Sequence, residues 1–257
     1  DRAKVLKALG NAVKALDVSN AQSENLRLEF LWTYQTIDEV NADLLTAVLT
    51  AKDYRARAAA VRVLSQWKGR LNDEGAYVKQ LAALVDDEHS RVRLEAVRAL
   101  ARVESAEAAD IAMRVMAREG GMDTNLEYAL WTTLRDLKAQ WFPQVESGTL
   151  AFTKDNDQIL YALNAIDSGE AVGPLLKLYT GGTLTPEQQR KALNDLAKHG
   201  DAPALGKVVA HILAANTQAV AQRADHLNHV LNTSKRRGVK PTTDLAGLDA
   251  LIKDNKN

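Results

Sequence analysis

Apolar residues recur at helical spacing through most of this chain, in segments separated by short polar stretches. In residues 41–53, Leu44, Leu45, Val48 and Leu49 follow the spacing that places apolar side chains on one face of a helix. Similar segments recur along the chain, at residues 41–53, 74–88, 106–119, 170–181 and 202–216. The pattern therefore predicts a recurring helix rather than a single domain of mixed elements.

A second recurring segment lies between these helices. Residues 53–67 and 87–103 each contain an Asp, a short gap, an Arg-x-Arg pair and then Ala-Val-Arg-x-Leu. Placing these segments in register extends the match to six rows at intervals of 30 to 36 residues, marked by Arg27, Arg57, Arg93, Glu127, Leu160 and Arg190. Each repeating unit is therefore predicted to be a pair of helices.

A single pair of short helices cannot bury its apolar faces, but stacked pairs share one continuous core. We therefore expect an all-α fold, an α-α superhelix of about six to seven pairs that occupies residues 1–257 and continues beyond both ends. Pro143 and Gly148 interrupt the periodicity, which predicts an irregular seam at residues 138–157. A basic linker is expected at residues 231–243, followed by another first helix at residues 242–257.

Composition narrows the classes of function. The 257 residues are 46% hydrophobic and 5% aromatic, which favours helices, and 33 basic residues balance 33 acidic ones. This balance disfavours binding to nucleic acid, which usually requires a basic excess. The absence of cysteine excludes disulfides, thiolate catalysis and zinc fingers in this chain. No apolar run reaches the roughly 18 residues that span a bilayer, so membrane insertion is not expected.

The rows resemble HEAT repeats, in which an acidic residue in the inter-helix loop precedes a second helix that opens with an arginine. Asp53 precedes Arg57 by four residues, and Asp87 precedes Arg93 by six. The resemblance implies a structural ladder in which these side chains tie each loop to the neighbouring pair. A partly buried bidentate pair of this kind stabilises more than the ~0–1 kcal/mol of an exposed pair.

A functional interpretation of the same arginines competes with the ladder. In that interpretation a positively charged face binds an anionic partner and is lined by Arg27, Arg55, Arg57, Arg91 and Arg93. The ladder is favoured because the arginines repeat together with their acidic neighbours. For Arg93→Ala, a ladder predicts a lower melting temperature.

Other candidate interaction residues are aromatic or basic. Trp32, Trp67 and Trp131 fall on second helices, where core packing is expected, whereas Trp141 lies in the Pro-containing break and is predicted to be a partly exposed anchor. The one compact positive cluster could contact an acidic protein surface or simply be a solvated loop, and it comprises Lys235, Arg236, Arg237 and Lys240.

Motifs for chemistry are missing from the sequence. It contains no glycine-rich phosphate loop, no H-E-x-x-H and no G-x-S-x-G. The one metal-like spacing joins His226 to His229 beside Asp225, but nothing distant in the sequence supplies a fourth ligand. We therefore predict no catalytic residue, no cofactor and no metal ion, and a protein as the partner.

Residues 24–142 also resemble the HEAT-repeat region of large bacterial membrane-associated dehydrogenases. The segments that carry this resemblance are RLEFLWTYQTIDEVNADLL, RARAAAVRVLSQW, DDEHSRVRLEAVRALARVESAEAADIA and LEYALWTTLRDLKAQW. In that family a sugar-dehydrogenase-like β-propeller precedes the repeats and a c-type cytochrome domain follows. The resemblance implies a periplasmic or otherwise exported protein in which these residues form a non-catalytic scaffold, while the residues themselves do not exclude the cytoplasm.

Two alternative functions stay open from the sequence. One is a HEAT-like nucleic-acid-binding or DNA-repair protein, against which the zero net charge and the interleaved acidic residues argue. The other is a HEAT-like lyase or chaperone for a cofactor-bearing protein, similar in fold to the phycobilin lyases. The residues do not indicate an oligomeric state.

Overall fold

The computed structural model describes residues 2–17, 20–71, 73–118, 120–149, 152, 155–215 and 219–243. Within these ranges the regular structure is helical and contains no strand. The α-helices are α1 (Arg2–Lys14), α2 (Ala21–Thr36), α3 (Ala42–Leu49), α4 (Tyr54–Gln66), α5 (Glu74–Val85), α6 (Ser90–Leu100), α7 (Ala106–Met113), α8 (Thr124–Asp136), α9 (Lys138–Ser147), α10 (Asn156–Ile166), α11 (Val172–Thr180), α12 (Pro186–His199), α13 (Ala202–Ala214) and α14 (Val220–Arg237). Two short 3-10 helices are η1 (Arg114–Ala117) and η3 (Gly169–Ala171). The predicted all-α solenoid is confirmed.

The chain divides into two compact units, Asp1–Trp141 and Phe142–Asn257, and each is described by itself. A single continuous solenoid over residues 1–257 stays a prediction. None of the helices in the described ranges is both long and apolar enough to span a bilayer.

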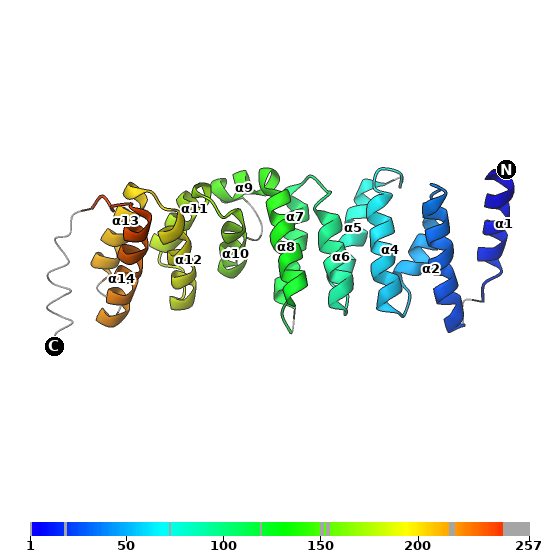
Figure 1. Cartoon of the computed structure of the whole chain (residues 1–257), viewed down its shortest axis with the longest axis horizontal. Helices are drawn as coiled ribbons and strands as arrows, with labels where there is room; N and C mark the ends of the chain where they lie inside the picture. The colour runs from blue at the N-terminus through cyan, green and yellow to red at the C-terminus, as the bar shows by residue number, and fades with distance from the viewer. Residues whose placement is uncertain are drawn as a thin grey trace. The chain divides into compact units, whose positions relative to one another are not determined.

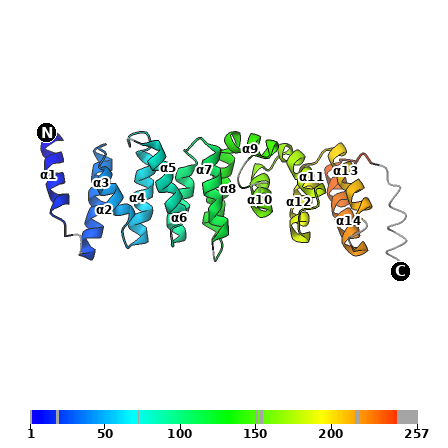
Figure 2. The ribbon, with the colours of Figure 1, turned by 180° about the vertical axis from the view of Figure 1, so that it is seen from behind.

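In the first unit the helices alternate between two layers. The second helix of each pair packs against the second helix of the next, so that α4 contacts α6 and α6 contacts α8. Figures 1 and 2 show these three helices side by side in chain order. Leu81 of α5, Val97 of α6 and Leu130 of α8 are completely buried. The apolar face of each helix is thus covered by its own partner and by the neighbouring pair.

Short polar loops set where each helix begins. The side chain at the N-cap accepts a hydrogen bond from the backbone of the first turn, which satisfies an amide that the helix itself leaves without an acceptor. In the first unit the caps are Asn41, Asp53, Asp73, His89, Ser105 and Asp123. Because each cap of this kind is worth about 1 kcal/mol, these residues specify the boundaries of the pairs.

The second unit repeats the two-layer arrangement. Helix α12 packs against α10, α11 and α14, while α13 packs against α11 and α14. Leu193 and Leu196 of α12, Val208 of α13 and Val230 of α14 are buried in this core. Thr185 begins α12 with a capping box to Gln188.

The expected irregular seam at residues 138–157 is wrong in its first part, because α9 is helical from Lys138 to Ser147 and contains Pro143. A proline inside a helix costs about 3 kcal/mol. Trp141, Phe142 and Val145 of the same helix are all buried. Since burying each such side chain contributes about 1.5–3 kcal/mol, their burial outweighs the cost of the proline.

The expected basic linker at residues 231–243 is also largely wrong, because α14 continues through Arg237. The helix ends at Gly238, whose φ of 69° is left-handed. Basic residues in the last turn are favoured by the partial negative charge at a helix C-terminus. Lys235, Arg236 and Arg237 therefore form the end of a helix rather than a linker. Residues 244–257, where another first helix was expected, lie outside the described residues.

The substitution Gly206→Ala tests whether the segment that follows α14 packs against α13. The Thr242 amide donates a hydrogen bond to the Ala202 carbonyl at 2.9 Å, and a Cβ at Gly206 would overlap the Thr242 backbone. We expect Gly206→Ala to lower the free energy of unfolding by about 1–3 kcal/mol, as overpacking does. Gly173→Ala is the matched control, because its Cβ meets open space in α11.

Urea unfolding measures both variants, and hydrogen exchange at the Thr242 amide reports the local effect. Equal stabilities for Gly206→Ala and Gly173→Ala would show that the segment around Thr242 is not held against α13.

Candidate interaction surface

Arg57 ties one helix pair to the next. Its side chain lies on α4 and is almost completely buried, with 8% of the residue exposed. Its Nε and Nη2 donate to the two carboxylate oxygens of Asp87 at 2.8 and 2.9 Å, and Nη2 also donates to Glu88 at 3.1 Å. Its Nη1 donates to the carbonyls of Ala51 and Lys52, both at 2.9 Å. Hydrogen bonding to Asp87 raises the pKa of the guanidinium, so Arg57 stays charged.

Arg93 repeats only part of this arrangement. Its Nη1 donates to the backbone carbonyls of Asp87 and Glu88, both at 2.9 Å, in the same relation that Arg57 has to residues 51 and 52. The pKa of Asp123 is lowered, chiefly by the hydrogen bond from the Leu126 amide and in smaller part by the charge of Arg93. Among the described residues the buried Nε of Arg93 has no hydrogen-bond partner. The Arg93 contact is therefore the weaker of the two.

Asp53 has a different role from Asp87. It caps α4 by accepting from the Arg55 amide at 2.8 Å, and it also accepts from the Arg55 side chain at 2.8–3.1 Å. The backbone amides of Lys52 and Asp53 instead donate to the Glu24 carboxylate of α2 at 3.1 and 3.4 Å. Sequence reasoning missed Glu24, because the next two rows have Tyr54 and Ser90 at that position.

The two arginines of each Arg-x-Arg pair face opposite ways. Arg55 and Arg91 are exposed, with 77% and 46% of their side chains accessible, whereas Arg57 and Arg93 are buried. Residues two apart on a helix lie on nearly opposite sides. The arginines therefore do not form one anion-binding face.

Arg223 is a third buried arginine, which sequence reasoning missed. It lies on α14, and its Nε and Nη2 donate to the carbonyls of Ile212 and Leu213 at 3.1 and 2.6 Å. It follows Arg190 by 33 residues, so the repeat interval contained a signal for it. Arg190, which the predicted repeat register aligns with Arg57 and Arg93, is exposed.

The residues of the predicted basic cluster have different roles in the structure. Lys235, Arg236, Arg237 and Lys240 are all exposed, but Arg237 also bonds to the neighbouring helix. The Nη1 of Arg237 donates to the carbonyls of Ala197 and Gly200 at 2.8 and 2.9 Å, which satisfies acceptors at the end of α12. Arg237 therefore serves the packing of α14 on α12.

The prediction of Trp141 as a partly exposed anchor is wrong. Trp141 is completely buried, and its Nε1 donates to the Leu134 carbonyl at 2.8 Å. This carbonyl belongs to the last turn of α8, where carbonyls have no amide donor within their own helix. Because residues 138–147 are helical, the tryptophan is directed at α8 rather than at solvent.

The other three tryptophans differ in burial. Trp67 is buried, as expected for a core residue, but Trp32 is 39% exposed. Trp131 is half-buried, stacks on the exposed Tyr128 with ring centroids 6.0 Å apart, and lies 4.5 Å beneath the Arg135 guanidinium. The core assignment is therefore wrong for Trp32 and only partly right for Trp131.

The spacing of His226 and His229 does not assemble a metal site in the described part of the chain, where no group of three potential ligands converges. His226 is buried, and its Nδ1 has no hydrogen-bond partner among the described residues. Burial lowers the pKa of His226, while Asp225 opposes this shift and His229 adds to it.

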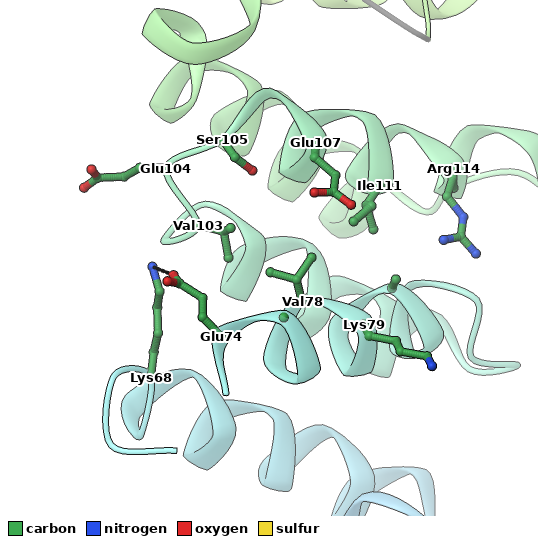
Figure 3. Close-up of a pocket in the computed structure, with 12 residues that line it drawn as sticks. Lys68, Glu74, Val78, Lys79, Val103, Glu104, Ser105, Glu107, Ile111 and Arg114 are labelled. Carbon is green, nitrogen blue, oxygen red and sulfur yellow. Dashed lines mark ion pairs between the residues drawn. The ribbon is translucent and has the colours of Figure 1, made fainter. Parts of the chain in front are cut away.

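A groove of about 790 Å³ opens between α5 and α7 in the first unit. Figure 3 shows aliphatic side chains along its middle, where Val78 of α5 faces Val103 and Ile111. Val103 and Ile111 are buried, whereas Val78 keeps part of its surface accessible. Because first helices contact each other less closely than second helices, the groove opens on the first-helix layer.

Charged side chains lie at both ends of this groove. At one end Glu104 lies near Lys68 and Glu74, whose Nζ and Oε1 atoms form an ion pair at 3.5 Å (Figure 3). At the other end lie Lys79 and Arg114. The groove therefore has an apolar floor between ends of opposite charge. The sequence patterns did not predict it, since its lining comes from two different pairs.

Arg57→Ala tests the tie between pairs. Removing the guanidinium leaves Oδ2 of the part-buried Asp87 and two backbone carbonyls without the donor that Arg57 supplies, so we expect the free energy of unfolding to fall by about 3 kcal/mol. Arg93→Ala should lower it less, because Arg93 makes fewer contacts. Arg55→Ala, in the same helix but exposed, should change it by no more than about 0.5 kcal/mol. Urea unfolding measures all three, and equal effects of Arg57→Ala and Arg55→Ala would contradict the assignment.

The buried His226 predicts a loss of stability in mild acid. Because its pKa is lowered in the folded chain, the unfolded chain takes up a proton first as the pH falls below about 6.5. Its contribution is complete above about pH 6.5 and is lost as the pH falls toward the lowered pKa, by at most about 1.4 kcal/mol per pH unit.

Urea unfolding at about pH 7.5 and about pH 5.5 measures this loss. His226→Gln should reduce the difference between the two conditions. The exposed control His229→Gln should reduce it much less, because burial is the main cause of the lowered pKa of His226 and His229 adds only a smaller part. An unchanged pH dependence in His226→Gln would exclude His226 as the source.

One family model supports the repeat assignment. The family model for HEAT repeats matches residues 41–123, which run from the start of α3 to the cap of α8. No curated protein matches the chain. A solved structure, an engineered protein from the Northeast Structural Genomics Consortium, shares 16% identity with a TM-score of 0.36, covering 91% of this chain and 99% of its own. HEAT repeats are in general scaffolds for protein interaction. Residues 41–123 of this chain are a HEAT-repeat region.

Proposed function

We propose that this chain is a non-catalytic scaffold that binds another protein through its stacked helix pairs. The observation that carries the proposal is the coincidence of the HEAT-repeat match at residues 41–123 with the stack of α3 to α7 and the groove between α5 and α7. Stacked pairs present extended surfaces whose side chains vary without disturbing the core.

The buried charged residues support a scaffold role. Arg57 and Arg93 donate to loop carbonyls and Arg223 to carbonyls in the last turn of α13, and Arg57 also binds the carboxylates of the neighbouring pair. Their charges are thus engaged in joining helices. The side chains available for recognition lie on the outer faces of the layers.

We further propose that the scaffold belongs to a larger exported oxidoreductase of the periplasm. In that arrangement a β-propeller domain performs the dehydrogenation, a c-type cytochrome domain accepts the electrons, and the helix pairs hold or dock them. The support for this proposal is the resemblance of residues 24–142 to the HEAT-repeat region of such dehydrogenases.

Purification of the protein with its natural partners tests both proposals. We expect a complex of defined stoichiometry in light scattering after gel filtration, and haem absorbance with a propeller sequence in the complex if the oxidoreductase assignment holds. A defined complex without haem or propeller would overturn only the finer proposal. Elution as a lone monomer, with no discrete cross-linked product, would contradict the scaffold function.

A further inference from the structure

We propose that the groove between α5 and α7 binds an amphipathic helix of the partner protein, with a basic residue at one end of its apolar face and an acidic residue at the other. This inference rests on the proposed scaffold function and names the surface and the chemistry of the partner. The groove lies wholly within the first unit.

The charge on each end of the groove is not fully neutralised. At the acidic end, Glu104 and Glu107 are exposed and form no ion pair among the described residues, whereas Glu74 forms an ion pair with Lys68. This end therefore carries an excess of negative charge. A lysine or arginine of the partner would be attracted to it.

The other end carries the opposite charge. Lys79 is exposed and forms no ion pair in the described part of the chain, and Arg114 pairs with Asp86 alone. Figure 3 shows Lys79 and Arg114 on the two sides of the groove at this end. One positive charge is left over, and it would attract an aspartate or glutamate of the partner.

The acidic and basic ends of the groove lie about two turns of a helix apart. Glu107 is seven residues from Arg114, which lies across the groove from the exposed Lys79, and this separation along α7 and into η1 corresponds to about 10 Å at 1.5 Å per residue. A partner helix with a basic residue at position i and an acidic residue at i+7 would reach both ends. Its residues at i+3 and i+4 share the same face and would cover Val78 and Ile111.

A helix fits this groove better than an extended peptide or a nucleic acid. An extended strand needs backbone partners, as on a sheet edge, but the walls of the groove are helices whose backbone groups are already bonded to each other. A helix satisfies its own backbone and needs only side-chain contacts. The phosphates of a nucleic acid would be repelled by Glu104 and Glu107.

Peptide display on the full chain tests the inference. We expect a random 15-residue library to yield binders with Lys or Arg and Asp or Glu seven residues apart, separated by aliphatic residues at i+3 and i+4. Glu104→Lys/Glu107→Lys should weaken these binders at least about tenfold, as expected when a complementary charge becomes a like charge. A peptide whose basic residue is replaced by Glu should regain affinity for this variant.

The matched control, Glu29→Lys/Asp43→Lys, makes the same change in net charge at exposed positions outside the groove. It should bind the selected peptides like the wild type. Thermal unfolding by circular dichroism shows whether each variant is folded, and the rescue by the exchanged peptide also requires a folded groove.

Binders that ignore the Glu104→Lys/Glu107→Lys change overturn the inference and leave the scaffold function standing. A library that yields no binder also overturns the inference. The scaffold function falls only if purification of the natural protein likewise yields no complex.

Discussion

The burial of apolar side chains between neighbouring helix pairs is the contact on which the rest of this structure depends. A helix of 8 to 18 residues gains little from its own hydrogen bonds in water and is stable only when one face is covered. Here each pair covers the next, as the complete burial of Leu81, Val97 and Leu130 shows. The repeat interval, the short loops and the polar caps all serve this stacking.

Stacking also buries backbone carbonyls, and the buried arginines supply the hydrogen-bond donors that these carbonyls need. Where a second helix packs over the loop or the helix end that precedes it, it covers backbone carbonyls that have no donor within a helix. Arg57 and Arg93 donate to loop carbonyls in the first unit, and Arg223 donates to carbonyls in the last turn of α13 in the second. A buried guanidinium is costly unless its donors are satisfied. Arg57 has two carboxylates and two carbonyls as partners, so its buried charge is better satisfied than that of Arg93.

The same stacking leaves one layer free for recognition. The second helices contact each other closely, whereas the groove between α5 and α7 opens on the first-helix layer. Glu104, Glu107 and Lys79 contribute nothing to the joints between pairs and keep their charges exposed. A scaffold can therefore vary these residues to suit a partner while the arginine ties and the apolar core hold the pairs together.

The sequence by itself determined the helical pairs, because periodicity, caps and repeat interval are local properties, and it placed Arg57 and Arg93 in equivalent positions of the repeat. It did not show that Asp53 binds Arg55, that Trp141 is buried, or that a groove lies between α5 and α7. Each of these depends on which faces meet across different helices. The tertiary structure alone decided them, because a side chain about 30 residues away can supply the hydrogen bond or the apolar contact that reverses a local preference.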